Sequence, residues 1–138
     1  MQVIEYRRAL HRIPELDRDL PETLAYLRSV LEPLGCALFS PIPGALCAFF
    51  DFGKADAIAF RSDADALPIQ EQTGLPFAST HPGKMHACGH DGHMSMVLDL
   101  AVWLDSQNDL KHNVLLIFQP AEETTGGAKD LCQSGVFE

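Results

Sequence analysis

Residues 85–93 hold most of the side chains in this sequence that could do chemistry. The segment runs Met-His-Ala-Cys-Gly-His-Asp-Gly-His and contains three imidazoles, one thiol and one carboxylate. Zinc and similar ions bind thiolate sulfur, imidazole nitrogen and carboxylate oxygen. Cys88 and His90 flank Gly89, and a tight turn at this glycine would let both side chains face one ion. From the residues alone, a buried cysteine beside loop histidines is an almost equally good interpretation.

A predicted helix begins just after Cys88 and His90, with Asp91 and His93 at its positive end. A thiolate close to a helix amino terminus has a lowered pKa. We therefore expect a lowered pKa for Cys88, which would suit metal binding.

Two further groups of acids follow predicted strands. Glu122 and Glu123 come about thirty residues after the first segment, where ligands bind in open α/β sheets. One could bind metal while the other takes a proton from water, although two ordinary surface acids are the alternative. Asp63 and Asp65 end another strand on one face. They could bind metal, orient a ligand histidine, or simply cap the strand.

Composition limits the classes of function. The 138 residues, 46% hydrophobic and 21% charged, are typical of one soluble globular domain. The net charge of −9 argues against nucleic acid or an anionic membrane as main partner. The sequence has no run of about 18 apolar residues, so it predicts no membrane span. Residues 1–12 lack the apolar centre of a signal peptide. We expect a cytoplasmic protein whose four scattered cysteines form no zinc knuckle.

Apolar periodicity predicts the elements that must position these groups. Helices are expected over residues 2–12, 21–34, 92–106 and 126–133, and strands over 46–50, 57–60 and 114–118. Residues 67–84, rich in Pro, Gly, Ser and Thr, predict a long loop. The helix over 92–106 has apolar residues on nearly every face and should be well buried.

The order of these elements favours an α/β fold with a mixed, largely parallel sheet and helices packed on it. The strands 46–50 and 57–60 should pair antiparallel, because a six-residue link is too short for a crossover. The continuously apolar strand 114–118 should be central and parallel.

Five motifs, in order and at this spacing, resemble the N-terminal part of the M20 metallopeptidases, in their amidohydrolase branch. That branch includes hippurate hydrolases, N-acyl-amino-acid deacylases, N-acetyl-diaminopimelate deacetylases and auxin-conjugate hydrolases. The motifs occupy residues 7–16 (RRALHRIPEL), 61–68 (RSDADALP), 73–79 (TGLPFAS), 83–94 (GKMHACGHDGHM) and 118–123 (FQPAEE), the last followed by 126–128 (GGA).

The resemblance implies roles for individual residues. Cys88, His90 and Glu123 would be metal ligands, and Glu122 the general base that activates a bridging water. Asp65 matches an acidic position near the site and would support it. Family sites hold two divalent ions, Zn²⁺ or Mn²⁺, and hydrolyse an amide bond. The implied substrate is a small N-acyl amino acid or short peptide.

The family pattern extends beyond this chain. Members supply one more histidine ligand after the acidic pair and another near the C-terminus, and they insert a lid or dimerisation domain. We expect residues 1–138 to be the N-terminal portion of the catalytic domain, without the lid domain and the C-terminal half. The metal site would then be incomplete and the isolated chain weakly active or inactive. Uncovered strand edges predict a homo-oligomer or a compact, rearranged remnant.

Two other functions stay open. The chain could be a non-catalytic metal-binding remnant or interaction module, and convergence of Cys88, His90 and Glu123 would argue for surviving metal chemistry. A glycosidase-like pair of carboxylates is a weaker alternative, because it leaves the Cys-Gly-His segment unexplained.

Overall fold

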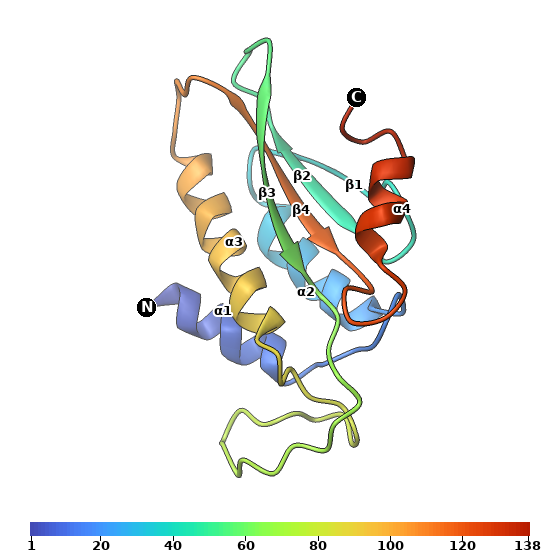
Figure 1. Ribbon diagram of the computed structural model, residues 1–138. Coiled ribbons are helices and arrows are strands. Elements are labelled where there is room, and N and C mark those ends of the chain that lie inside the picture. Colours follow the sequence, from blue (N-terminus) through green and yellow to red (C-terminus); the bar gives the residue numbers. More distant parts are fainter.

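The computed structural model describes residues 1–138 and contains four helices and four strands (Figure 1). In chain order they are α1 (Gln2–His11), α2 (Pro21–Leu31), β1 (Ala37–Phe39), β2 (Leu46–Phe50), β3 (Ala57–Asp63), α3 (His90–Asp105), β4 (Asn113–Gln119) and α4 (Gly127–Gln133). Every predicted helix and strand is present, with ends shifted by a few residues. β1 was not predicted from the sequence, because its three residues are too few to show a periodic pattern.

The sheet has the order β1-β2-β4-β3. β4 pairs antiparallel with β2 and parallel with β3. The predicted antiparallel pair of β2 with β3 is therefore wrong, because β4 lies between them. Two strand spacings are about 10 Å, and a six-residue link reaches about 20 Å when extended, so residues 51–56 can cross over the inserted strand. β4 is buried at every position, and the middle of the sheet gives it hydrogen-bond partners on both sides.

The α/β class and the mixed sheet with packed helices are confirmed, as is the central place of β4. The expected predominance of parallel pairing is not found among these strands. β1 with β2 and β2 with β4 are antiparallel, and only β3 with β4 is parallel.

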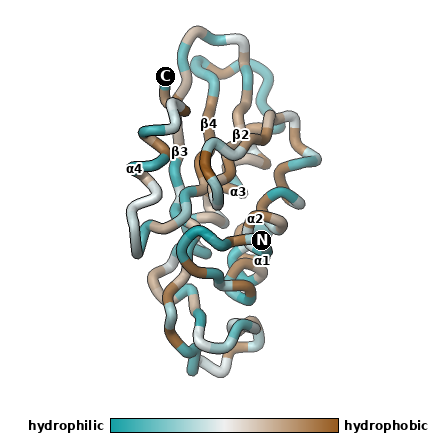
Figure 2. Tube along the Cα trace, turned by 90° about the vertical axis from the view of Figure 1, so that its right-hand side faces the viewer, coloured by the Kyte–Doolittle hydropathy of each residue, from teal (hydrophilic) through white to brown (hydrophobic).

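The sheet buries both faces of its central strands. On one face, Leu46 and Ala48 of β2 and Leu116 and Phe118 of β4 pack into one core cluster with α1, α2 and α3. On the other, Cys47, Leu115 and Ile117 pack with Leu131 of α4. The apolar run of β4 is visible as a brown stretch of the tube in Figure 2. This alternation fixes the register of β4, and with it the place where its polar carboxyl end emerges.

α3 is less buried than predicted. Met94, Leu98 and Ala101 are fully buried against the sheet and α1, but Met96 is 60% exposed and Trp103 51%. The apolar residues therefore do not mark burial on every face, and one side of the helix remains open. None of the four helices is long and apolar enough to cross a membrane.

The predicted loop is confirmed. Residues 64–89 connect β3 to α3 below the sheet in the view of Figure 1, with one isolated bridge between Leu67 and Met85. The loop brings Cys88 back to the edge where β3 and β4 end.

Candidate metal centre

The carboxyl ends of β3 and β4 and the start of α3 meet at one end of the sheet. Because β3 and β4 run parallel with Asp63 opposite Gln119, their carboxyl ends lie side by side. α3 starts there at His90, and Gly89 before it has a φ of 110°, a conformation that suits glycine. This turn is what the Cys-Gly-His sequence requires if both flanking side chains are to face the strand ends.

The turn after β4 has its own local cause. Pro120 follows the strand, Ala121 has a positive φ of 56°, and the chain reverses into α4. A Cβ on Gly127 would lie 2.0 Å from the carbonyl oxygen of Pro120, so only glycine allows this close approach. The reversal places Glu122 and Glu123 opposite His90.

The structure brings together the three side chains singled out in the sequence. One donor atom from each of Cys88, His90 and Glu123 lies within 4.8 Å of the other two. His90 Nε2 is 3.6 Å from a carboxylate oxygen of Glu123. Ligand atoms around one zinc ion are about 3–4 Å apart, given bond lengths of about 2.0–2.3 Å. Cys88 is exposed, so the alternative of a buried structural cysteine is excluded.

Asp65 lies behind this group and ties it together. Its two carboxylate oxygens accept the backbone N–H groups of Glu122 and Glu123, each at 3.0 Å. Its backbone carbonyl accepts a 2.7 Å hydrogen bond from His90 Nδ1, which leaves Nε2 of that ring free to bind metal. Burial by itself would raise the pKa of Asp65, but the contact with His90 and the two backbone N–H groups lower it overall. A charged Asp65 thus orients one imidazole and two glutamates.

Asp63 and His93 form a second group around the same imidazole. His93 Nδ1 donates a 2.7 Å hydrogen bond to Asp63, whose other oxygen is 3.4 Å from His90 Nε2. The rings of His90 and His93 stack with their centroids 5.6 Å apart. These three residues also have metal-binding spacing, but they share His90 Nε2 with the first group, so one ion at most can use it.

The expected pKa of Cys88 is wrong in direction. The hydrogen bond to Glu123, burial and the charges of Glu123, Glu122 and Asp63 raise the pKa of the Cys88 thiol to about 11. The effect of these carboxylates outweighs that of the helix end, and the hydrogen bond with Glu123 is the largest contribution. The same negative charges attract a cation, which must displace the thiol proton when it binds.

Sequence reasoning missed two features close by. His86 is buried and neither ring nitrogen has a hydrogen-bond partner within the protein; burial lowers its pKa to about 4. A network of the ionisable side chains of Arg7, His11, Glu71 and Asp91 also joins α1 to the start of α3. The sequence did not indicate this network, because its members lie up to 84 positions apart, between residues 7 and 91.

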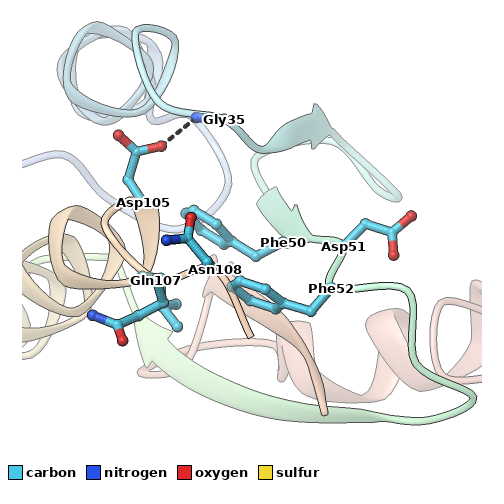
Figure 3. A pocket seen from close by; sticks show the side chains of 8 residues that line it. Gly35, Phe50, Asp51, Phe52, Asp105, Gln107 and Asn108 are labelled. Carbon is cyan, nitrogen blue, oxygen red and sulfur yellow. Dashed lines mark hydrogen bonds between the residues drawn. The ribbon is translucent and has the colours of Figure 1, made fainter. Parts of the chain in front are cut away.

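The group formed by Cys88, His90 and Glu123 lies at the protein surface. A separate cavity of about 330 Å³ lies at the other end of α3, lined by side chains such as Phe50, Phe52 and Asn108 (Figure 3). Asp105 there accepts the backbone N–H of Gly35 at 2.7 Å. This cavity has no cysteine, histidine or glutamate in its wall, so it is not part of the candidate metal centre.

Known proteins are similar to this chain in sequence and in fold. Peptidase family M20/M25/M40 matches residues 59–138. The N-acetyldiaminopimelate deacetylase of Lactobacillus helveticus (strain DPC 4571) is 42% identical over 143 residues, covering 99% of this chain and 37% of that relative. The N-acetyl-L-cysteine deacetylase of Bacillus subtilis (strain 168) is 44% identical over 141 residues, covering 99% and 34%. The chain thus spans little more than a third of the length of these curated relatives.

A solved structure agrees with the fold. The crystal structure of a dinuclear metal binding peptidase from the M20 family of Bacillus subtilis superposes with a TM-score of 0.91 at 41% identity, covering 97% of this chain and 39% of that chain. A leucine aminopeptidase precursor from Bacteroides thetaiotaomicron, 15% identical with a TM-score of 0.65, shares the fold alone.

Proposed function

Because this chain belongs to the M20/M25/M40 peptidase family, we propose that it forms part of a metal-dependent hydrolase that cleaves the amide bond of N-acyl amino acids. The observation that carries the proposal is the convergence of Cys88, His90 and Glu123 from distant parts of the sequence. Both relatives named above are deacetylases of amino acids by name, which supports a small N-acyl amino acid as substrate.

The donor set fits a divalent transition ion. One thiol, one imidazole and one carboxylate suit Zn²⁺, and we propose Zn²⁺ or Mn²⁺ as the metal. When bound, the ion supplies a Lewis acid that acidifies water and polarises the amide carbonyl. The dinuclear character of the Bacillus subtilis M20 peptidase supports two ions, and a second ion needs donors beyond these three residues.

Glu122 is the proposed general base. Its carboxylate is 40% exposed and lies 3.8 Å from His90 Nε2, so it stands beside the ligands and faces solvent. In this position it can take a proton from the attacking water and pass it to the leaving amine. Asp65 is a positioning residue, because it holds the backbone of Glu122 and orients His90 without reaching the reacting atoms.

Self-association is the proposed partnership, in the cytoplasm. β3 is an edge strand in this sheet, and Ile58 and Phe60 on it are 45% and 44% exposed. Such an edge offers unpaired backbone groups and apolar side chains to a second copy.

Catalysis itself is expected to be weak or absent in residues 1–138 alone, and a non-catalytic metal-binding module is therefore the second candidate function.

Metal binding and turnover together test the proposal. We expect Cys88→Ser and Glu123→Ala to lower the affinity for Zn²⁺ at least tenfold, because each removes one proposed ligand. Glu122→Gln should keep the metal, and in a full-length relative carrying the same motifs it should abolish hydrolysis of N-acetyl amino acids. Cys132→Ser is the matched control, since this thiol is also exposed but lies on α4. Equal Zn²⁺ affinity in all four variants and the wild type would contradict the proposal. Robust turnover by residues 1–138 would refute the metal-binding module.

A further inference from the structure

Four ionisable side chains meet beside the proposed ligands. Arg7 and His11 come from α1, Glu71 from the loop before α3, and Asp91 from the first turn of α3. The side chains of His11, Glu71 and Asp91 are at most 3% exposed. Ionisable groups are costly to bury unless they are paired, so the contacts among these side chains decide whether the fold tolerates them.

His11 is the centre of the network. Its Nδ1 lies 2.7 Å from a carboxylate oxygen of Asp91, and its Nε2 lies 2.9 Å from one of Glu71. Each ring nitrogen therefore lies within hydrogen-bond distance of a carboxylate oxygen. One imidazole therefore connects the loop directly to the start of α3.

Asp91 is fixed from three sides. Arg7 Nε is 2.9 Å from the oxygen that also accepts from His11. The other oxygen accepts the backbone N–H of Gly92 at 2.9 Å. Since Asp91 directly follows His90, these bonds also restrict the backbone of that proposed ligand.

Glu71 anchors the loop. Its carboxylate accepts the backbone N–H of Ser79 at 3.0 Å and a short hydrogen bond from Thr73. Burial alone would raise the pKa of Glu71, but these hydrogen bonds and the contact with His11 lower it overall. Phe77 of the same loop lies under the guanidinium groups of Arg7 and Arg8, at 5.2 and 5.0 Å.

The Cys88-Gly89-His90 turn lies between Glu71, which holds the loop, and Asp91, which holds the start of α3. On one side the loop returns through the Leu67–Met85 bridge and reaches Cys88 three residues later. On the other side Asp91 follows His90. We infer that Arg7, His11, Glu71 and Asp91 form a positioning network that holds the Cys88-Gly89-His90 turn in its metal-binding geometry. The inference rests on the proposed metal centre and adds residues that touch none of its donor atoms.

Cobalt binding tests the network in the complete 138-residue chain. Co²⁺ reports both affinity and, through its sulfur-to-metal charge-transfer absorption, whether the thiolate of Cys88 is bound. We expect Glu71→Gln and His11→Gln to lower Co²⁺ affinity tenfold or more, within the range of about 10–100-fold seen when outer hydrogen-bond partners of metal ligands are lost. The charge-transfer band at saturation should also weaken. Should His11→Gln fail to fold, Glu71→Gln decides.

His81→Gln is the control. His81 joins the same loop to the N-terminal region, with Nδ1 2.7 Å from the carbonyl oxygen of Pro14 and Nε2 2.6 Å from Glu22, but it does not contact Asp91. This variant should keep wild-type affinity and absorption. Wild-type Co²⁺ binding in Glu71→Gln, or equal losses in His81→Gln, would overturn the network alone. A wild-type chain that binds no Co²⁺ overturns the metal centre and the network with it.

Discussion

At the scale of single residues, the candidate site has two sides. Backbone N–H groups of Glu122 and Glu123 face Asp65, and the carboxylates of the same two residues face His90. Asp65 is fully enclosed and accepts two backbone N–H groups, while Glu122 and Glu123 keep their carboxylates toward His90. The pattern D-x-D identified Asp63 and Asp65 as a pair, but it could not assign their separate tasks. Those tasks depend on His90 lying between the two side chains, which is a tertiary contact.

Replacement of Asp65 should cost both stability and metal. In Asp65→Asn one backbone N–H faces an amide NH₂ instead of an oxygen, so a buried donor loses its acceptor. We expect the free energy of unfolding to fall by about 2–4 kcal/mol. Urea denaturation measures this change. Asp109→Asn, which removes only an exposed ion pair with Lys54, should change it by less than about 1 kcal/mol. Similar values for the two variants would contradict the role of Asp65.

The raised pKa of Cys88 predicts slow alkylation at neutral pH. The thiolate is the reactive form, and the surrounding carboxylates hold the thiol protonated until the pH approaches about 11. In a Cys132→Ser background, the rate of reaction of Cys88 with iodoacetamide should still be rising steeply above pH 10, when measured without metal. A rate that levels off by about pH 10, as for a thiol of ordinary pKa, would show that the acidic neighbours do not control this thiol.

At the scale of elements, what the sequence predicts well is what local pattern decides. The apolar run of β4, the proline start of α2 and the long polar loop were all foreseeable from periodicity and turn residues. The position of β4 between β2 and β3 was not, because strand neighbours depend on which faces the helices cover. The burial of α3 was overestimated for the same reason. Met96 and Trp103 are apolar, but no other element packs over them.

Gly127 tests the turn that carries the acidic pair. A Cβ there would overlap the carbonyl oxygen of Pro120, so Gly127→Ala should force the start of α4 away from β4. We expect a loss of more than about 2 kcal/mol in the free energy of unfolding. Gly92→Ala is the matched comparison, since nothing lies within 4 Å of its added Cβ and it sits inside α3. It should be neutral or stabilise by up to about 1 kcal/mol. Thermal melts of both variants, if indistinguishable, would reject this account of the turn.

At the scale of the whole molecule, the sheet ends in two edge strands, the short β1 and the longer β3. β3 pairs only with β4, and apolar side chains flank it on both faces. The sequence indicated an uncovered edge, but the position of that edge at β3 required the strand order.

The open edge predicts association. We expect multi-angle light scattering to give a mass above that of the 15.2 kDa monomer at micromolar concentration. Phe60→Lys should shift the population toward monomer, because a lysine on an edge strand opposes strand pairing. Ile69→Lys, at a similarly exposed position in the loop, should not. A wild-type chain that is monomeric at every accessible concentration would exclude association through β3.

In the proposed metal centre, Cys88, His90 and Glu123 bind one ion together. X-ray absorption at the zinc edge of the Zn²⁺-loaded protein tests it most directly. We expect one sulfur at about 2.3 Å with nitrogen and oxygen ligands at about 2.0–2.2 Å, and loss of the sulfur in Cys88→Ser. A zinc environment of nitrogen and oxygen only in the wild type would contradict it.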